Sequence, residues 1–175
     1  GMSLRTGMTY GTASAIAGAA AILTAVLFGE SFGSGTIINI AGCAVMIDAI
    51  QAAHLIPQMH GLVSGIAMLI GGLELLALGT WLYMKSALGS GPRDALMVAL
   101  ARKFGRSAGA CRAVVDVLVT VIGFFLGGPV GVGTIISAVG LGPLINLNFA
   151  AVRFNPAEVH QENAAETIAR IAGKR

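Results

Sequence analysis

Five long apolar stretches dominate the pattern of hydrophobic and polar positions along the chain. They predict helices over about residues 9–28, 36–53, 62–84, 108–126 and 134–152. Each is about 20 residues long, enough to cross a hydrocarbon core of about 30 Å as a helix. None shows the polar face at helical period that a soluble helical bundle needs in order to meet water. The expected fold class is therefore all-α, a polytopic membrane protein.

A shorter segment separates the third and fourth stretches. Pro92 at a first helical position, Ser90 before it and Asp94 in the first turn make a helix start. The apolar run over residues 95–101 is too short to cross a bilayer. We expect a half-helix that either lies at the membrane interface or dips into the protein.

The composition fits this assignment, because 55% of the residues are apolar and only 11% are charged, against about 25% charged in soluble proteins. Apart from Arg5, every basic residue falls on or near one side of the predicted bundle: Lys85, Arg93, Arg102, Lys103, Arg106, Arg112, Arg153, Arg170, Lys174 and Arg175. The charge bias predicts a plasma-membrane protein with a cytoplasmic C-terminus and an external N-terminus. Basic residues at the membrane explain the net charge of +3, so no nucleic-acid partner is expected.

One sequence phrase occurs twice, a GxGT turn that opens an apolar helix. The copies over residues 33–42 and 131–140 lie 98 positions apart, and the same offset pairs Gly7 with Gly105 and Gly11 with Gly109. This ungapped spacing predicts an internal duplication. A unit of three crossings has an odd count, so its two copies must face opposite ways, as in many secondary transporters.

The predicted duplication also sets the expected domains. A transmembrane domain over residues 1–152 contains a partial first repeat (1–53) and a second repeat (62–152), and a charged cytoplasmic tail follows over 153–175, with a short amphipathic or partly disordered helix from about residue 155. The first copy lacks an opening span and most of a half-helix. Gly1 is not a natural initiator, so we expect a fragment; the alternative is a start at Met2 after a cloning remnant.

The glycine-rich turns have a structural and a functional interpretation. A phosphate loop needs a lysine and a longer spacing, so we interpret the GxGT residues as tight turns in which threonine caps the next helix. The residues assigned to structural turns are Gly33, Gly35, Thr36, Gly131, Gly133, Thr134, Gly142 and Pro143. The turn with Gly89, Gly91, Pro92, Arg93 and Asp94 is the stronger functional candidate. Its helix N-terminus and Arg93 favour an anion, although a loop that needs glycine's freedom explains the same residues.

Ionisable side chains at membrane depth are expensive and mark candidate ion paths. Arg112 and Asp116 are four residues apart, so they share a helical face and can neutralise each other. Glu74 has no partner nearby in the sequence and is a candidate for proton exchange if it faces the bundle. Asp48 lies near the end of its span, where snorkelling to the interface is the expected explanation. Trp81 and Tyr83 are expected to form part of an interfacial aromatic belt.

The sequence indicates no metal site, no cofactor and no enzyme active site. Cys43 and Cys111 have neither metal nor redox spacing and are expected to be small buried residues. His54 and His60 have no third ligand nearby, so polar loop residues are expected there. No nucleophile, base and orienting group occur together.

Several motifs in order resemble one family. Residues 88–97, 100–105, 126–134 and 142–145 are similar to the YczE-type bacterial integral membrane proteins, which are related to the YitT group. The resemblance is close over residues 62–150 and looser over 1–50. It implies duplicated hydrophobic halves, each with a glycine-rich turn followed by proline and usually aspartate. It implies a membrane location but no established reaction.

Two functions are consistent with these patterns. The first is a small permease whose substrate path lies between the repeats near residues 89–94, with Glu74 and the Arg112–Asp116 pair as candidates for ion coupling. The second is a non-transporting membrane partner that supports another membrane or biosynthetic complex through small-residue helix faces. The expected partners are the lipid bilayer and either a small-molecule substrate or another membrane protein, a second copy of the chain included.

Overall fold

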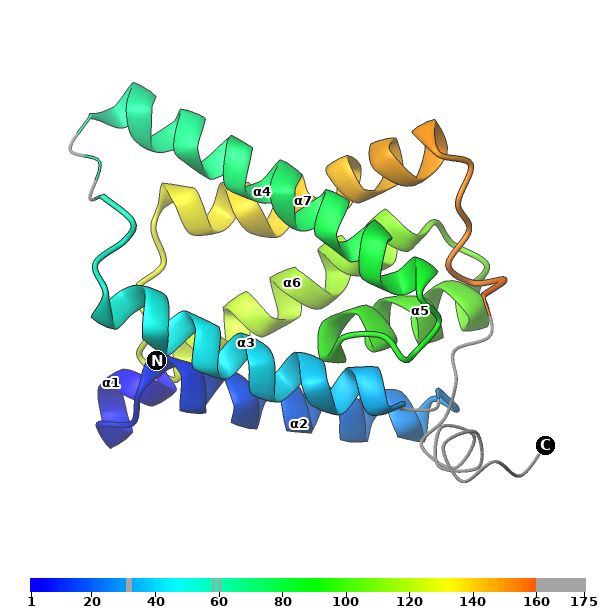
Figure 1. Ribbon diagram of the computed structural model, residues 1–175, viewed down its shortest axis with the longest axis horizontal. Coiled ribbons are helices and arrows are strands. Elements are labelled where there is room, and N and C mark those ends of the chain that lie inside the picture. The colour runs from blue at the N-terminus through cyan, green and yellow to red at the C-terminus, as the bar shows by residue number, and fades with distance from the viewer. Residues whose placement is uncertain (31–32, 58, 60, 160–175) are drawn as a thin grey trace.

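The computed structural model describes residues 1–30, 33–57, 59 and 61–159, and the described chain is all helical (Figure 1). Its helices are α1 (Met2–Thr6), α2 (Tyr10–Leu27), α3 (Ser34–Ala52), α4 (Leu62–Lys85), α5 (Pro92–Phe104), α6 (Ala108–Phe125) and α7 (Val132–Ala151). Five of them, α2, α3, α4, α6 and α7, are long and apolar enough to cross a membrane. The predicted all-α membrane fold is confirmed, and each predicted span agrees with its helix to within two residues.

The half-helix α5 lies in the half of the bundle that is opposite the N-terminus (Figure 1). It packs against α2 on one side and α6 on the other, while α7 packs against both α6 and α4, and α3 packs against α2. Large apolar side chains are exposed on the outer faces of the long helices, among them Leu23, Ile38, Leu75, Leu118 and Leu147. Such faces are suited to lipid rather than water.

The chain reaches α5 by turning back on itself. After α4 it returns toward the middle of the bundle, so that α5 begins there and runs outward to the end from which α6 starts (Figure 1). The buried side chains of α5 include those of Met97 and Val98. Of the two placements expected for the half-helix, the structure therefore shows the one that dips into the protein. Irregular backbone at this depth is tolerated because protein surrounds it.

The two GxGT phrases begin helices, as predicted, but with different boundaries. Gly33 and Gly131 are the N-cap residues, and their N–H groups donate to the hydroxyls of Thr36 (3.3 Å) and Thr134 (3.4 Å). Gly35 and Gly133 lie inside the first helical turns. Each Thr is therefore an N3 residue that bonds back to the cap, and not the cap itself.

The predicted turn at Gly142 and Pro143 is wrong, because both residues lie inside α7. Gly142 is there for helix packing. A Cβ atom built on Gly142 would lie 2.3 Å from the carbonyl oxygen of Gly109 in α6, and one built on Gly109 would lie 2.0 Å from the carbonyl oxygen of Gly142. Two glycines thus let the backbones of α6 and α7 approach closely, as small residues do in membrane helix pairs.

The α2–α3 pair carries a matching contact. The N–H of Gly11 donates to Asp48 Oδ1 at 2.8 Å, and the N–H of Gly109 donates to Asn146 Oδ1 at 2.8 Å. The donors Gly11 and Gly109 are 98 positions apart, and so are the acceptors Asp48 and Asn146. The internal duplication stays a prediction, but these contacts have the spacing that it requires.

Three further features differ from the sequence interpretation or lie outside it. The short helix α1 was not predicted, and it ends at Gly7 in a left-handed conformation (φ 72°), as α5 ends at Gly105 (φ 61°). Cys43 is exposed on α3, while Cys111 is buried as expected. The predicted tail helix falls mostly on residues 160–175, outside the described residues, and residues 156–159 form a turn and a bend.

Candidate functional site

A chain of buried polar groups joins α4, α5 and α6. Arg112 on α6 donates from Nε to Asp116 Oδ2 at 2.8 Å, and from Nη1 to Asp94 Oδ1 on α5. The other Asp94 oxygen, Oδ2, accepts from the hydroxyl of Tyr83 on α4. Arg112, Asp116 and Asp94 are exposed to only 5%, 7% and 8%. One guanidinium and two carboxylates are therefore buried together inside the protein.

Local sequence explains one link of this network and the re-entrant path of the chain explains the other. Arg112 and Asp116 share a face of α6 because they are four residues apart. Asp94 reaches Arg112 because α5 returns into the bundle and packs along α6. Tyr83 lies near the end of α4, where an interfacial position was expected, but its hydroxyl turns inward to Asp94.

The network leaves one polar atom unsatisfied. Asp116 Oδ1 is buried and accepts no hydrogen bond within the described part of the chain. An unpaired buried carboxylate oxygen is costly and calls for an explanation, such as a bound group.

Arg93 supplies a second unmatched group beside the network. It follows Pro92 in the first turn of α5, is exposed, and has no ion pair or hydrogen bond among the described residues. With Arg93 included, the two guanidinium charges balance the two carboxylate charges of Asp94 and Asp116.

A cavity of about 520 Å³ opens beside these charges, between α4, α6 and α7. Arg93, Arg112 and Asp116 line it together with the polar side chains of Tyr10, Thr120, Thr134 and Ser137. The apolar wall is formed by Leu69, Leu73, Leu76, Val119, Ala138 and Leu141. Polar and apolar side chains thus line it in nearly equal numbers, and a concave site with converging polar groups is typical of small-molecule binding.

The turn that precedes α5 is held tightly by α3. Thr36 donates its hydroxyl to the carbonyl of Ser90 at 2.8 Å, and the N–H of Gly35 donates to the carbonyl of Leu88 at 2.9 Å. Gly89 has a φ of 113°, which favours glycine, and a Cβ atom there would lie 2.7 Å from Thr36 Oγ1. This packing favours the structural interpretation for the glycines of the turn and leaves Arg93 and Asp94 as its chemically distinctive members.

Glu74 lies apart from this network. It is half-buried on α4 and accepts a hydrogen bond from the amide of Asn148 on α7 at 2.9 Å. It does not line the larger cavity. The partner that the sequence did not show is 74 residues away along the chain.

Asp48 has protein partners near the end of its span, and its snorkelling to an interface stays a prediction. Its carboxylate accepts from the N–H of Gly11 and from the hydroxyl of Thr9 at 2.8 Å. It therefore caps the free N–H groups at the start of α2 from the neighbouring helix.

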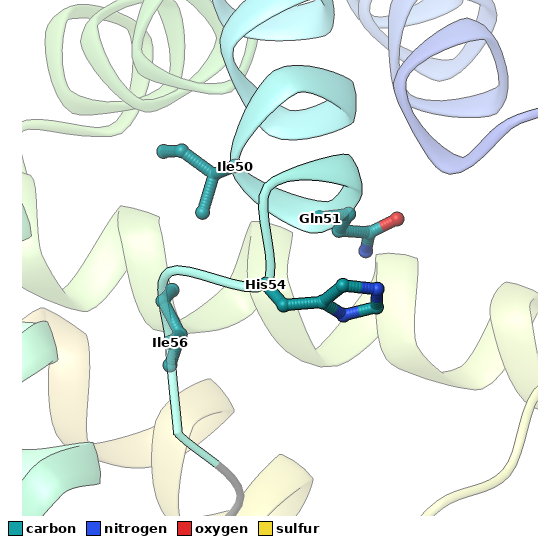
Figure 2. Close-up of a pocket in the computed structure, with 4 residues that line it drawn as sticks. All are labelled: Ile50, Gln51, His54 and Ile56. Carbon is teal, nitrogen blue, oxygen red and sulfur yellow. The ribbon is translucent and has the colours of Figure 1, made fainter.

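A smaller hollow of about 190 Å³ lies at the end of α3, lined by Ile50, Gln51, His54 and Ile56. Figure 2 shows Gln51 and His54 pointing the same way, away from Ile50. His60 lies outside the described residues, and no three His, Cys, Asp or Glu side chains cluster within the described ones. This hollow offers one imidazole and one amide, fewer polar groups than the larger cavity offers.

The sequence interpretation missed several members of the site. Tyr83, Tyr10, Thr120 and Ser137 carry no sequence signal of function, because their roles depend on contacts between helices. Asp94 was predicted as a helix start and as a member of the candidate functional turn, but its contact with Arg112 was not predicted. An acidic residue in a segment that turns back beside a basic transmembrane residue was the signal that could have linked it to Arg112.

Comparison with known proteins places the chain among membrane proteins. A family described as "Family of unknown function (DUF6198)" matches residues 1–149. The chain is 32% identical over 145 residues to an uncharacterized protein of Haemophilus influenzae, covering 83% of this chain and 66% of that protein. It is 28% identical over 157 residues to the uncharacterized membrane protein YczE of Bacillus subtilis, covering 84% of this chain and 72% of YczE. The chain thus spans about two thirds of the length of the first relative. No solved structure matches it.

Proposed function

Because this chain belongs to the YczE-type family of integral membrane proteins, a family of unknown function, we propose that it is a small permease whose substrate enters the cavity between α4, α6 and α7. The observation that carries the proposal is the network of Asp94, Arg112 and Asp116 at the wall of that cavity. Charges within membrane segments are costly and commonly line substrate or ion paths.

The re-entrant helix supports the same proposal. Broken segments that begin near the middle of the membrane are a recurring feature of transporter binding sites. Here the start of α5 brings Arg93 to the cavity and Asp94 to the network. Asp116, with its unsatisfied oxygen, is the first candidate for coupling to an ion, and Glu74 is the second.

We also propose a bacterial plasma-membrane location with the C-terminus in the cytoplasm. Lys85, Arg102 and Lys103 lie in the last turns of α4 and α5, Arg106 precedes α6 and Arg153 follows α7. These helix ends share one end of the bundle, opposite the N-terminus (Figure 1). Positive charge favours the cytoplasmic side. Arg93 and Arg112, which also entered the sequence count, line the cavity and not this end of the bundle, so they do not bear on orientation.

The proposal is tested by transport in vesicles that contain the full-length protein. Uptake and efflux of amino acids, small anions and lipopeptide-like compounds should reveal a substrate, and Asp116→Asn should abolish its flux. Ser14→Ala, a small change on α2 outside the cavity, is the control and should transport normally. Absence of any flux together with co-purification of a fixed partner would show that the protein is not a permease.

Orientation is tested separately by a tag at the C-terminus. The tag should be protected from protease in intact cells and accessible in inverted vesicles. Accessibility in intact cells would reverse the proposed topology without affecting the argument about the cavity.

The second candidate is a non-transporting membrane partner. The observation that favours it is the face of α3 that carries Ile37, Ile38, Val45 and Met46, all exposed. α7 packs extensively against two helices, whereas the extensive packing of α3 is with α2. A partner protein or a second copy of the chain could cover this face, and co-purification in the experiment above would detect either.

A further inference from the structure

We infer that the cavity binds a small zwitterion, a molecule with an ammonium group for the unsatisfied Asp116 Oδ1 and a carboxylate for the unpaired Arg93. The inference rests on the proposed function, since it names the class of substrate for the same cavity. It is carried by the presence of both residues, each with an unmatched polar group, in the lining of one cavity.

The ammonium end follows from the hydrogen bonds of the two carboxylates. Asp94 uses Oδ1 for Arg112 and Oδ2 for Tyr83, so both of its oxygens have partners. Asp116 uses only Oδ2, for Arg112, and lines the cavity. Oδ1 is closed to a water-sized molecule in this structure, so a donor bound beside Asp116 satisfies it when the carboxylate rotates toward the cavity. A positively charged donor forms the stronger bond.

The carboxylate end follows from Arg93. A guanidinium stays protonated in proteins and can bind a carboxylate with two parallel hydrogen bonds. Arg93 lies in the first turn of α5, where the helix dipole adds to its positive charge. Arg112 is less suited to this role, because its charge is already paired with Asp94 and Asp116.

Charge balance favours one zwitterion over a simple cation or anion. Arg93 and Arg112 balance Asp94 and Asp116, so a neutral ligand keeps the site neutral, whereas a singly charged ligand leaves a net charge beside the buried ions. The volume of about 520 Å³ suits a small molecule. Leu69, Leu73 and Leu76 on α4 form an apolar wall for an aliphatic side chain.

A matched set of three compounds tests the inference. Leucine carries both charges, isoamylamine lacks the carboxylate, and isocaproate lacks the ammonium group. Binding to the purified full-length protein in lipid nanodiscs is measured by titration calorimetry, which needs no transport. We expect leucine to bind at least about tenfold more tightly than either relative, since each charge-assisted hydrogen bond is worth about that factor.

Two variants test which residue binds the carboxylate and which binds the ammonium group of the ligand. Arg93→Gln should weaken leucine about tenfold and leave isoamylamine unchanged, while Asp116→Asn should weaken leucine and leave isocaproate unchanged. Arg106→Gln, which removes an exposed arginine outside the cavity, is the control and should bind all three compounds as the parent does. Arg93 is exposed and unpaired, so its variant carries the test even if Asp116→Asn does not fold.

The outcomes separate this inference from the proposed function. Equal binding of isocaproate and leucine, or no binding of leucine at millimolar concentration, overturns the zwitterion. Transport of a simple anion that depends on Arg93 but not on Asp116 also overturns it, while supporting a permease. Tight, Arg93-dependent binding of leucine without any flux supports the zwitterion site and overturns the permease.

Discussion

The helix pairs α2–α3 and α6–α7 share a packing contact but differ in their charges. In each pair a backbone N–H, of Gly11 or Gly109, donates at 2.8 Å to a side chain of the neighbouring helix. At the positions 98 residues before Arg112 and Asp116, however, α2 carries Ser14 and Gly18. The half-helix α5 packs against both α2 and α6.

This difference shows that the packing does not require the charges. A Cβ atom on Gly18 would lie 3.2 Å from Pro92, so α2 meets the start of α5 through a small residue and a ring. α6 meets it instead through Arg112 and Asp94. Buried ions carry a desolvation penalty of several kcal/mol each that an apolar contact avoids. Chemistry at the cavity is the reason that we propose for their presence on α6.

The largest effect is expected from removing the central charge. Arg112→Met leaves Asp94 and Asp116 buried without a cation, and should lower the free energy of unfolding by about 3–5 kcal/mol. The measurement is unfolding of the purified protein in mixed micelles at neutral pH. Ser14→Met, at the corresponding position of α2, is the control and should cost much less, because no buried charge loses its partner.

A combined variant sharpens the same comparison by making α6 as uncharged as α2. Arg112→Met together with Asp94→Leu and Asp116→Leu should recover most of the stability lost in the single variant, since apolar replacement of a whole ion cluster is often neutral. Flux and ligand binding should be absent in the combined variant, even where its stability is recovered. Recovery of both flux and ligand binding together with stability would show that the charges are needed neither for transport nor for binding.

The next effect concerns the close contacts that the two pairs share. Gly109→Ala would place a Cβ 2.0 Å from the carbonyl oxygen of Gly142, and Gly11→Ala would place one 2.3 Å from that of Ala44. Each should lower stability by about 1–3 kcal/mol, because the helices must move apart. Gly72→Ala on α4 is the control, with no atom within 4 Å of the new methyl group. A large loss at Gly109 alone would show that the two contacts are not equivalent.

The positions of the helices were predictable because hydrophobic length and turn chemistry are local. The five spans and the start of α5 at Pro92 follow from apolar runs and a proline at a first helical position. The turn at Gly142 and Pro143 was predicted wrongly because glycine and proline have the same local signal in a turn and at a close helix contact. Only the presence of Gly109 opposite Gly142 distinguishes the two.

The sequence could predict a contact in the site only where the spacing of two residues along one helix places them side by side. Arg112 and Asp116 could be paired from the sequence because they are four residues apart on one helix. The partners of Glu74 and Asp48 are 74 and 37 residues away, and no local pattern shows them. The link from Asp94 to Arg112 depends on α5 turning inward, which the sequence left as one of two alternatives.

A smaller effect is expected at the side-chain acceptors of the two pairs. Asp48→Ala and Asn146→Ala each remove the acceptor of a helix-start N–H, which should cost about 0.5–2 kcal/mol. Asp48 should cost more, because a carboxylate near a helix N-terminus is also favoured by the dipole. Unfolding in micelles measures both. Asp48→Asn, which makes the α2–α3 pair resemble α6–α7, should cost less than Asp48→Ala, and an equal loss would mean that charge rather than hydrogen bonding dominates.

The smallest effect is a pH dependence that comes from a loop carboxylate present only in the first pair. Glu30, in the loop between α2 and α3, is 6% exposed and accepts from Arg102 at 2.7 Å, whereas the position 98 residues later is Gly128. Burial raises the pKa of Glu30 above its ordinary value, and Arg102 offsets part of that rise.

A raised carboxyl pKa means that the folded protein binds the proton more tightly than the unfolded chain. The stability that this contributes is present below the unfolded pKa of about 4.3 and is lost as the pH rises through the folded pKa. Thermal unfolding in detergent from acidic to neutral pH should therefore show a decline over that window, and Glu30→Gln should flatten it. Glu158→Gln, at an exposed carboxylate, should leave the decline unchanged. A rise in stability over the same window would mean that the ion pair with Arg102 outweighs the burial of Glu30.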